Sequence, residues 1–222
     1  MWCSILWWLV GGIAVLNIPG LPLMFHVRLV IAMVSAWVSP KVDVLEGVSL
    51  SMRVWISECD LNLHMNNASY FAVADLGRYA LAIGSGLAAH ARAHGMYLAN
   101  GGVSLRFRRE LKPLAAYTHV TRLHSIDHKW MYLEHRFEDP ENPDRIHAIG
   151  YSRMVAKQGR TTVPPATLLA DVGYADQVAV VQAFAASKGS GKSLGCLANA
   201  IDEELFEIPA TRRVGSLFSK DD

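Results

Sequence analysis

The chain has 222 residues, of which 51% are hydrophobic and 18% are charged, and its formal net charge is +1. This length suits one domain with a sizeable core and short appendages. The near-zero charge argues against a nucleic-acid-binding surface or a strongly acidic partner. Three widely spaced cysteines, Cys3, Cys59 and Cys196, form neither a disulfide framework nor a zinc pattern, so we expect no metal or other cofactor.

The first 38 residues are apolar and predict attachment to a membrane. From position 2 to position 38 only Cys3, His26 and Arg28 are ionisable, and prolines interrupt the run. A full span needs about 20 apolar residues. The favoured interpretation is therefore a signal anchor followed by an interfacial helix at residues 27–38. A cleaved signal peptide and a re-entrant hairpin are the alternatives.

Positive charge lies only on the C-terminal side of this apolar run. The residues concerned are Arg28, Lys41 and Arg53. Cytoplasmic flanks of membrane segments are enriched in Lys and Arg, so we expect the folded domain to face the cytosol.

The next segments predict a strand, a loop and a helix. Apolar and polar residues alternate over residues 48–56, as in a half-buried strand, and a polar loop covers residues 58–66. Apolar side chains then recur at helical spacing from residue 67 onward, and glycines can end that helix. Asn66 or Asn67 is a suitable N-cap.

Alternation returns in four later segments, which predict antiparallel strands. They cover residues 102–111, 117–127, 129–139 and 145–159, with a turn at residues 138–144. One long helix followed by a meander of this size predicts an α+β fold in which an antiparallel sheet wraps around a central helix.

The sequence therefore divides into three parts. Residues 1–38 form the membrane segment, residues 44–160 the α+β domain, and residues 161–222 a C-terminal extension. In that extension we expect short helices at residues 174–187 and 194–206 and a flexible tail.

The loop at residues 59–67 carries the candidate chemistry. Asp60, Asn62 and His64 occupy alternate positions, so an extended loop would aim all three side chains the same way. The following helix start offers unpaired N–H groups and the positive end of a dipole. Such a site can polarise a carbonyl oxygen while a carboxylate or imidazole activates water, as acyl hydrolysis requires. The alternative is that these residues only cap and turn the chain.

The segment DLNLHMNNASY, residues 60–70, closely resembles the D-x-N-x-H-x-N-N-x-x-Y signature of hotdog-fold acyl thioesterases. That group includes 4-hydroxybenzoyl-CoA thioesterases and acyl-ACP thioesterases. Residues 105–110, LRFRRE, resemble the L-E-Y-R-R-E segment of plant acyl-ACP thioesterases. The central helix and the apolar N-terminus look most like the endomembrane group of thioesterase superfamily member 6. The resemblance covers residues 48–157 and implies a hotdog fold.

The resemblance also implies roles for the loop residues. Asp60 would be the carboxylate that activates water or attacks the thioester. Asn62 and His64 would hold and polarise that water, with His64 a possible base near neutral pH. The backbone N–H of Asn67 would stabilise the developing oxyanion.

Three further residues receive roles from the resemblance. Glu110 corresponds to an assisting carboxylate, although it lies fifty residues after Asp60, a wider gap than in the family. Asn66 and Tyr70 complete the signature and would bind the substrate. Because hotdog sites form between subunits, with the acyl chain along the helix, a homodimer is implied.

The function expected from these observations is hydrolysis of fatty-acyl-CoA or acyl-ACP thioesters at an endomembrane, with the endoplasmic reticulum favoured. Two alternatives stay open. One is a non-catalytic hotdog module that binds lipids or scaffolds a membrane complex, since folds outlive their activities. The other is a dehydratase that acts on hydroxyacyl thioesters. No nucleic-acid partner is expected.

Overall fold

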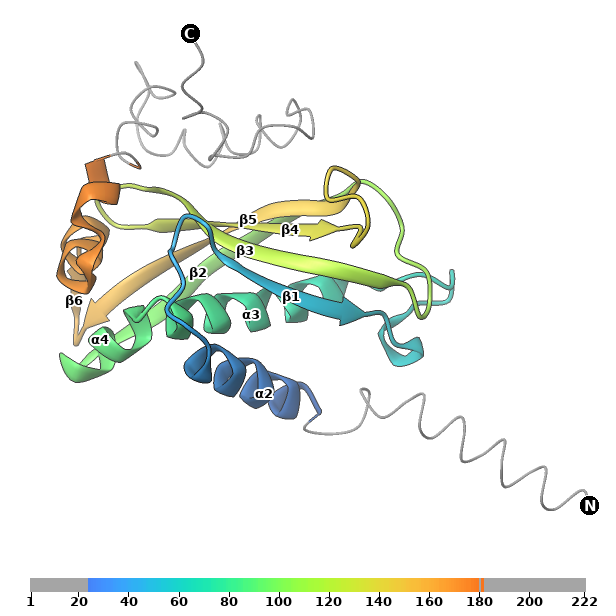
Figure 1. Ribbon diagram of the computed structural model, residues 1–222, viewed down its shortest axis with the longest axis horizontal. Helices are drawn as coiled ribbons and strands as arrows, with labels where there is room; N and C mark the ends of the chain where they lie inside the picture. The colour runs from blue at the N-terminus through green and yellow to red at the C-terminus, as the bar shows by residue number, and fades with distance from the viewer. Residues whose placement is uncertain (1–23, 180, 182–222) are drawn as a thin grey trace, which may run out of the picture.

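The computed structural model describes residues 24–179 and residue 181. In this part of the chain an antiparallel sheet curls around a long helix, α3, and a second helix, α2, packs on the side of α3 that faces away from the sheet (Figure 1). The predicted α+β layout, an antiparallel sheet around a central helix, is confirmed.

The six strands form one sheet with the order β1-β3-β4-β5-β2, and β6 pairs with β5. All pairs are antiparallel. The strands are β1 (Val48–Arg53), β2 (Met96–Phe107), β3 (Ala116–Ile126), β4 (Met131–Glu138), β5 (Ile146–Gln158) and β6 (Thr161–Val163). The helices are α2 (Met24–Val38), α3 (Asn67–Gly84), α4 (Leu87–Ala93) and α5 (Pro165–Leu169), with a 3₁₀ turn η2 (Ile56–Glu58) and a π-type turn η3 (Ala170–Tyr174). None of the helices in the described residues is both long enough and apolar enough to span a bilayer.

The bounds of β1 and β2 differ most from the sequence prediction. β1 ends at Arg53 instead of residue 56, because the 3₁₀ turn η2 begins at Ile56. β2 begins at Met96, six residues before the predicted start, and ends at Phe107. Its register on β5 shifts between Asn100 and Gly102. This bulge breaks the alternation of period two, so the first half of the strand has no clear pattern in the sequence.

Helix α3 begins where the sequence predicts. The Asn66 side chain caps it by accepting a hydrogen bond from the Ala68 N–H, at 2.9 Å. One face of the helix is buried against the concave side of the sheet, where apolar strand residues meet it. The main core cluster includes Ala80 and Leu81 from α3 and Leu123, Met131, Leu133, Met154 and Ala156 from the strands.

The segment after residue 160 packs on the same core. Leu168, Leu169 and Tyr174 are buried in the cluster that α3 and the sheet form. The Tyr174 hydroxyl lies 2.9 Å from the Val42 carbonyl and 3.0 Å from the Ser85 carbonyl. The helix predicted at residues 194–206 lies outside the described residues.

Gly77 lies where α3 passes close to β3. A Cβ added there would overlap Thr121 Oγ1 and lie 2.5 Å from His119 Cε1. We expect Gly77→Ala to lower the free energy of unfolding by about 1–3 kcal/mol, the usual cost of overpacking. The control is Gly84→Ala in the same helix, whose Cβ would meet the Val42 side chain at 3.4 Å. It should be neutral or stabilising by up to about 1 kcal/mol. Urea unfolding measures the stability of both variants. Equal effects would contradict a close contact between α3 and β3 at Gly77.

Candidate active site

The predicted catalytic loop is a tight turn. Cys59 and Met65 form an isolated antiparallel bridge, and the Asp60 N–H donates to the His64 carbonyl at 2.9 Å. The Leu63 N–H donates to the Asp60 carbonyl at 3.1 Å, and Leu63 adopts a left-handed backbone with φ of 56°. The expectation of an extended loop is therefore wrong, because these hydrogen bonds reverse the chain within the segment.

Because the turn folds the chain back on itself, it brings the side chains of Asp60 and His64 together. His64 Nδ1 lies 3.3 Å from Asp60 Oδ2, and both side chains are about one-third exposed. The other carboxylate oxygen, Oδ1, accepts the Asn62 N–H at 2.9 Å, which fixes the carboxylate. When Nδ1 donates to Asp60, the opposite ring nitrogen of His64 is left as a proton acceptor. A carboxylate–imidazole pair in contact with water can serve as a general base.

Asn62 lies at the exposed tip of the turn. Leu61 is fully exposed and Leu63 is 71% exposed, so apolar side chains flank Asn62 in solvent. Among the described residues, no hydrogen bond joins the Asn62 side chain to Asp60 or His64. The structure thus brings the side chains of Asp60 and His64 together, and the Asn62 side chain bonds to neither of them.

The start of α3 lies directly after this turn. Asn66 is used structurally, because its side chain caps the helix and its N–H donates to the Glu58 carbonyl at 2.8 Å. Asn67 is exposed at the first helical position, where a backbone N–H has no partner within the helix. The described residues supply no other acceptor for it. This N–H, at the positive end of the helix dipole, can donate to a substrate oxygen.

Tyr70 is a core residue. It is 3% exposed, and its ring lies 5.0 Å from that of Phe107 and 4.9 Å from that of Phe137. Burial raises the pKa of Tyr70 to about 12, opposed by a hydrogen bond to the Leu111 backbone. The ring therefore joins α3 to the sheet, and the role in substrate binding that the resemblance implies for Tyr70 stays a prediction.

Glu110 belongs to a segment that contacts the turn. The Met65 N–H donates to the Leu111 carbonyl at 2.8 Å, so the residue after Glu110 lies beside the predicted loop. The Glu110 carboxylate is exposed and lies 3.7 Å from Lys112 Nζ. The fold brings this segment to the site, while the carboxylate itself pairs with a lysine at the surface.

Glu58 and Arg28 hold the turn in place, and the sequence analysis did not select either as a site residue. The Glu58 carbonyl accepts the Asn66 N–H and the Ser69 hydroxyl, and its carboxylate accepts the Trp55 N–H. Arg28, from α2, donates to the same carboxylate at 2.5 Å. The sequence feature that could have indicated this ion pair is Arg28 itself, a lone arginine within an apolar helix. The ion pair ties α2 to the candidate site.

We expect Arg28→Met to lower the free energy of unfolding by about 1–3 kcal/mol. The change leaves the Glu58 carboxylate, whose side chain is 10% exposed, without its cation. A double-mutant cycle with Glu58→Gln in urea isolates the pair. A coupling free energy below about 0.5 kcal/mol would show that the contact does not stabilise the fold.

Cys59 adjoins Asp60 but is not an activated nucleophile. Burial, together with the charges of Glu58 and Asp60, raises the pKa of the Cys59 thiol. Its Sγ lies 3.4 Å from the Trp55 carbonyl. Since the thiolate is the reactive form, this environment works against nucleophilic catalysis.

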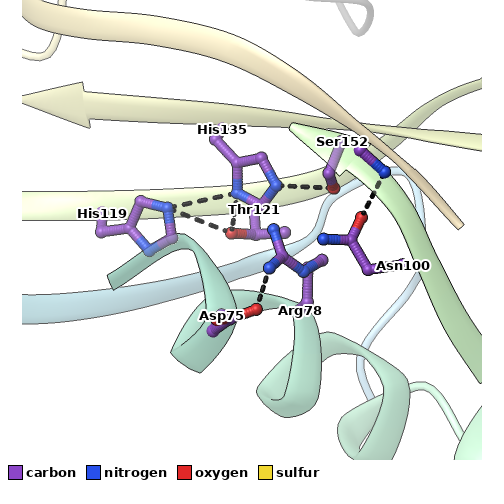
Figure 2. A network of polar contacts seen from close by, with 8 residues as sticks. Asp75, Arg78, Asn100, His119, Thr121, His135 and Ser152 are labelled. Atoms are coloured by element: carbon purple, nitrogen blue, oxygen red, sulfur yellow. Dashed lines mark hydrogen bonds and ion pairs between the residues drawn. The ribbon is translucent and has the colours of Figure 1, made fainter. Parts of the chain in front are cut away.

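A second polar cluster lies between the sheet and α3, inside the core (Figure 2). His135 Nε2 lies 2.8 Å from Ser152 Oγ, and His135 Nδ1 lies 3.1 Å from Thr121 Oγ1 and 3.3 Å from His119 Nε2. None of the four is more than 1% exposed. The sequence analysis missed them, although each occupies an inward position of an alternating strand. The Ser152–His135 pair is closed to solvent and is part of the packed core.

Burial also sets the charge of this cluster. It lowers the pKa of His119 to about 3, with a smaller contribution from the Arg78 guanidinium. It holds the pKa of His135 well below its ordinary value, assisted by His119 and Arg78. Both imidazoles are therefore neutral at physiological pH.

Comparison with known proteins matches residues 54–179, more than half of the chain, to the Thioesterase-like superfamily. Thioesterase poxG of Penicillium oxalicum is 28% identical over 214 residues, which covers 75% of this chain and 71% of that protein. Protein THEM6 of Danio rerio is 37% identical over 99 residues, which covers 45% of this chain and 49% of that protein. The crystal structure of YbaW, a probable thioesterase from Escherichia coli, gives a TM-score of 0.49 at 17% identity and covers 57% of this chain and 96% of that one. The resemblance to hotdog-fold acyl thioesterases is thus confirmed, and the chain belongs to the Thioesterase-like superfamily.

Proposed function

We propose that this protein hydrolyses fatty-acyl thioesters of CoA or acyl carrier protein. The observation that carries the proposal is the contact between Asp60 and His64, in a turn that leads directly to the free Asn67 N–H. A base and an oxyanion donor thus lie at the same end of α3. Both are needed to add water to a thioester carbonyl.

In the proposed reaction the Asp60–His64 pair takes a proton from water, and the hydroxide adds to the carbonyl carbon. The Asn67 N–H donates to the oxyanion that forms. The carbon–sulfur bond then breaks, the thiolate leaves and accepts a proton, and a fatty acid remains. No residue needs to form a covalent intermediate in this scheme.

The test is a set of thioesters offered to the full chain. Palmitoyl-CoA and palmitoyl-ACP should release a free thiol, while 3-hydroxypalmitoyl-CoA should be hydrolysed and not dehydrated. Binding of palmitoyl-CoA with every thioester left intact would contradict the proposal and favour a lipid-binding module. Loss of water from the hydroxyacyl substrate would instead favour a dehydratase.

We further propose that α2 rests on a membrane surface. Its outward face carries apolar side chains at helical spacing, all of them at least 46% exposed: Val27, Val30, Ile31, Val34, Trp37 and Val38. An amphipathic helix of this kind buries its apolar face at the lipid interface. The residues before α2, which lie outside the described part, are equally apolar in sequence. Arg28, Lys41 and Arg53 favour the cytosolic face of an endomembrane, in our proposal that of the endoplasmic reticulum.

Flotation with phosphatidylcholine vesicles tests the role of α2. In the chain from Met24 onward, which lacks the predicted anchor, we expect Val30→Glu with Ile31→Glu to reduce the partition coefficient at least ten-fold, since burying one such side chain stabilises by about 1.5–3 kcal/mol. The control is Ser35→Glu with Ser39→Glu, which adds the same charge at positions outside the apolar set. Equal partitioning of the two variants would contradict the proposal.

The proposed homodimer would use the free edge of β2. This strand ends the sheet, and among the described residues only β5 pairs with it. A strand of 12 residues with an open edge is a template for another strand. Sedimentation of the full chain in detergent should give twice the mass of one copy. A monomer at micromolar concentration would contradict this arrangement.

A further inference from the structure

The outward face of the sheet, which points away from α3, is buried. Alternate residues of β4 and β5 pack in the clusters that contain α3, for example Phe137 and Ala148. The residues between them therefore point outward. These include Tyr132, Ile149 and Tyr151, which are 5%, 3% and 4% exposed. An antiparallel sheet with one face on a core commonly leaves the other face polar and in contact with water, and this sheet does not.

Among the described residues no helix packs on this outward face. Helices α2, α3 and α4 lie on the concave side of the sheet (Figure 1), and α5 packs into the core cluster around α3. The apolar residues gathered on the outward face, here called the outward cluster, come from β4 and β5: Tyr132, Ile146, Ile149 and Tyr151. Only Trp130, from the turn before β4, packs against them. Side chains stand roughly perpendicular to a sheet, so their outer ends stay accessible unless a further layer covers them.

Two buried donors on the same face have no hydrogen-bond partner among the described residues. They are the Tyr151 hydroxyl and Nη2 of Arg136, a side chain of β4 that is 4% exposed. The two buried carboxylates of this face, Glu134 and Glu138, already pair with Arg122 and Arg136. Buried polar groups are nearly always hydrogen-bonded, because a donor removed from water loses its bonds there. The covering layer should therefore present acceptors as well as apolar side chains.

The C-terminal part of the chain is long enough to form this layer. Residues 182–222 follow Val181, whose side chain is buried in the core cluster. Figure 1 shows the described chain ending at the end of the sheet where β6 lies. An extended stretch from residue 182 to residue 193 spans about 40 Å, and β5, with 13 residues, is about 43 Å long. Residue 194 and those after it can therefore reach the outward cluster.

The helix predicted at residues 194–206 has the side chains that this face requires. Its large apolar residues recur at spacings of three and four and would form one stripe: Leu194, Leu197, Ile201 and Leu205. At about 100° per residue, Asp202 and Glu204 would flank this stripe on its two sides, and Glu203 would lie opposite. A helix that rests on its apolar stripe would thus carry carboxylates at the edges of the contact, where they can accept hydrogen bonds from Arg136 and Tyr151.

We propose that residues 182–222 dock on the outward face of the sheet of their own chain, with the stripe on the outward cluster and a flanking carboxylate at Arg136. The domain then has three layers, in which the sheet lies between α3 and the C-terminal segment. The segment covers neither the free edge of β2 nor the apolar face of α2. The docking depends on no step of the proposed hydrolysis.

Hydroxyl-radical labelling of the full chain in detergent, read by mass spectrometry, measures whether the outward tyrosines are covered. Leu197→Glu with Ile201→Glu places two charges in the stripe, which cannot be buried there without partners. This variant should raise the oxidation rates of Tyr132 and Tyr151 at least about five-fold. Tyr117, which is 0% exposed on the inward face, is the internal reference and should stay protected in parent and variant. Unchanged rates at Tyr132 and Tyr151 would overturn the proposal.

The matched control is Cys196→Glu with Asn199→Glu, which adds the same charge on the side of the predicted helix opposite the stripe. It should leave the oxidation of both outward tyrosines at the parental rate. An equal rise in the two variants would show that the stripe does not make the contact, and would overturn the proposal.

The polar part of the contact is tested by Asp202→Asn with Glu204→Gln. This variant removes both flanking carboxylates and should also raise the oxidation rate of Tyr151. Glu203→Gln, on the side opposite the stripe, is its control and should have no effect. A parental rate in the first variant would exclude the carboxylates from the contact with Arg136.

Photo-crosslinking tests the same contact in a chain whose stripe carries no added charge. Benzoylphenylalanine in place of Ile201 should crosslink to residues 130–138 or 146–153 of the same chain, in a product with the mass of one copy. The same probe in place of Asn199 should not reach these residues. Crosslinks from residue 201 to this face of another copy would assign the face to a second copy and overturn the proposal. The absence of crosslinks to β4 and β5 would overturn it as well, whether or not the charged variant folds.

Discussion

Asp60→Asn is expected to lower kcat/KM for palmitoyl-CoA by about 10²–10⁴-fold, the contribution of a positioned general base. Asparagine keeps an oxygen that can accept the Asn62 N–H, a hydrogen bond that is 2.9 Å long in the parent. The turn should therefore survive the change. What is lost is the charge that orients His64 and helps to take the proton from water. Thiol release in single-turnover and steady-state assays measures the effect.

The control for this substitution is Asp144→Asn, which makes the same chemical change in the exposed turn between β4 and β5. It should leave kcat/KM within two-fold of the parent. Circular dichroism and urea unfolding should be alike for all three proteins. If Asp60→Asn hydrolyses palmitoyl-CoA at the parental rate, Asp60 has no part in the reaction and the turn has only a structural role.

The stability of the domain is expected to fall steeply below pH 6.5 because of His119 and His135. Their folded-state pKa values are lowered, that of His119 to about 3. Below pH 6.5 the unfolded chain binds protons at both imidazoles, whereas the folded protein does not. Each histidine then costs about 1.4 kcal/mol of stability per pH unit, until the pH reaches its folded pKa. Above pH 6.5 both states are neutral at these positions, and the effect disappears.

Urea unfolding at pH 7.5, 6.5, 5.5 and 4.5 measures this dependence. Replacing both histidines with glutamine should reduce the loss by about 2.7 kcal/mol per pH unit below pH 6.5, since glutamine does not titrate. His128→Gln is the control, because the His128 side chain is 67% exposed. The comparison uses the slope of the free energy of unfolding against pH. A loss of packing in the double variant lowers the free energy at every pH and does not change this slope. An unchanged slope would show that the buried imidazoles become protonated without unfolding.

The candidate site combines parts that sequence analysis found with parts that it missed. The Asp60–His64 contact and the Asn67 N–H belong to the recognised signature. The support for the turn comes from Glu58 and Arg28, which are thirty residues apart in the chain. Because Arg28 lies in α2, this ion pair joins the helix to the residue whose carbonyl accepts the Asn66 N–H at the end of the turn.

The sequence by itself determined the local features of this protein. The cap at Asn66 and the helical spacing of α3 were readable because both depend on residues a few positions apart. The alternation in β3, β4 and β5 was readable for the same reason. The signature from Asp60 to Tyr70 identified the family without any coordinates. These are interactions within one turn of helix or along one strand, and short-range patterns record them.

Only the tertiary structure decided which of these residues meet. It turned the segment from Asp60 to His64 back on itself, buried Tyr70 between Phe107 and Phe137, and left the Glu110 carboxylate at the surface. It also placed histidines from β3 and β4 and a serine from β5 in one sealed cluster, and it gathered the outward cluster on β4 and β5. Each of these depends on packing between segments that are far apart in the chain. No local periodicity encodes such contacts, because side chains on different elements become neighbours only when the sheet closes over α3.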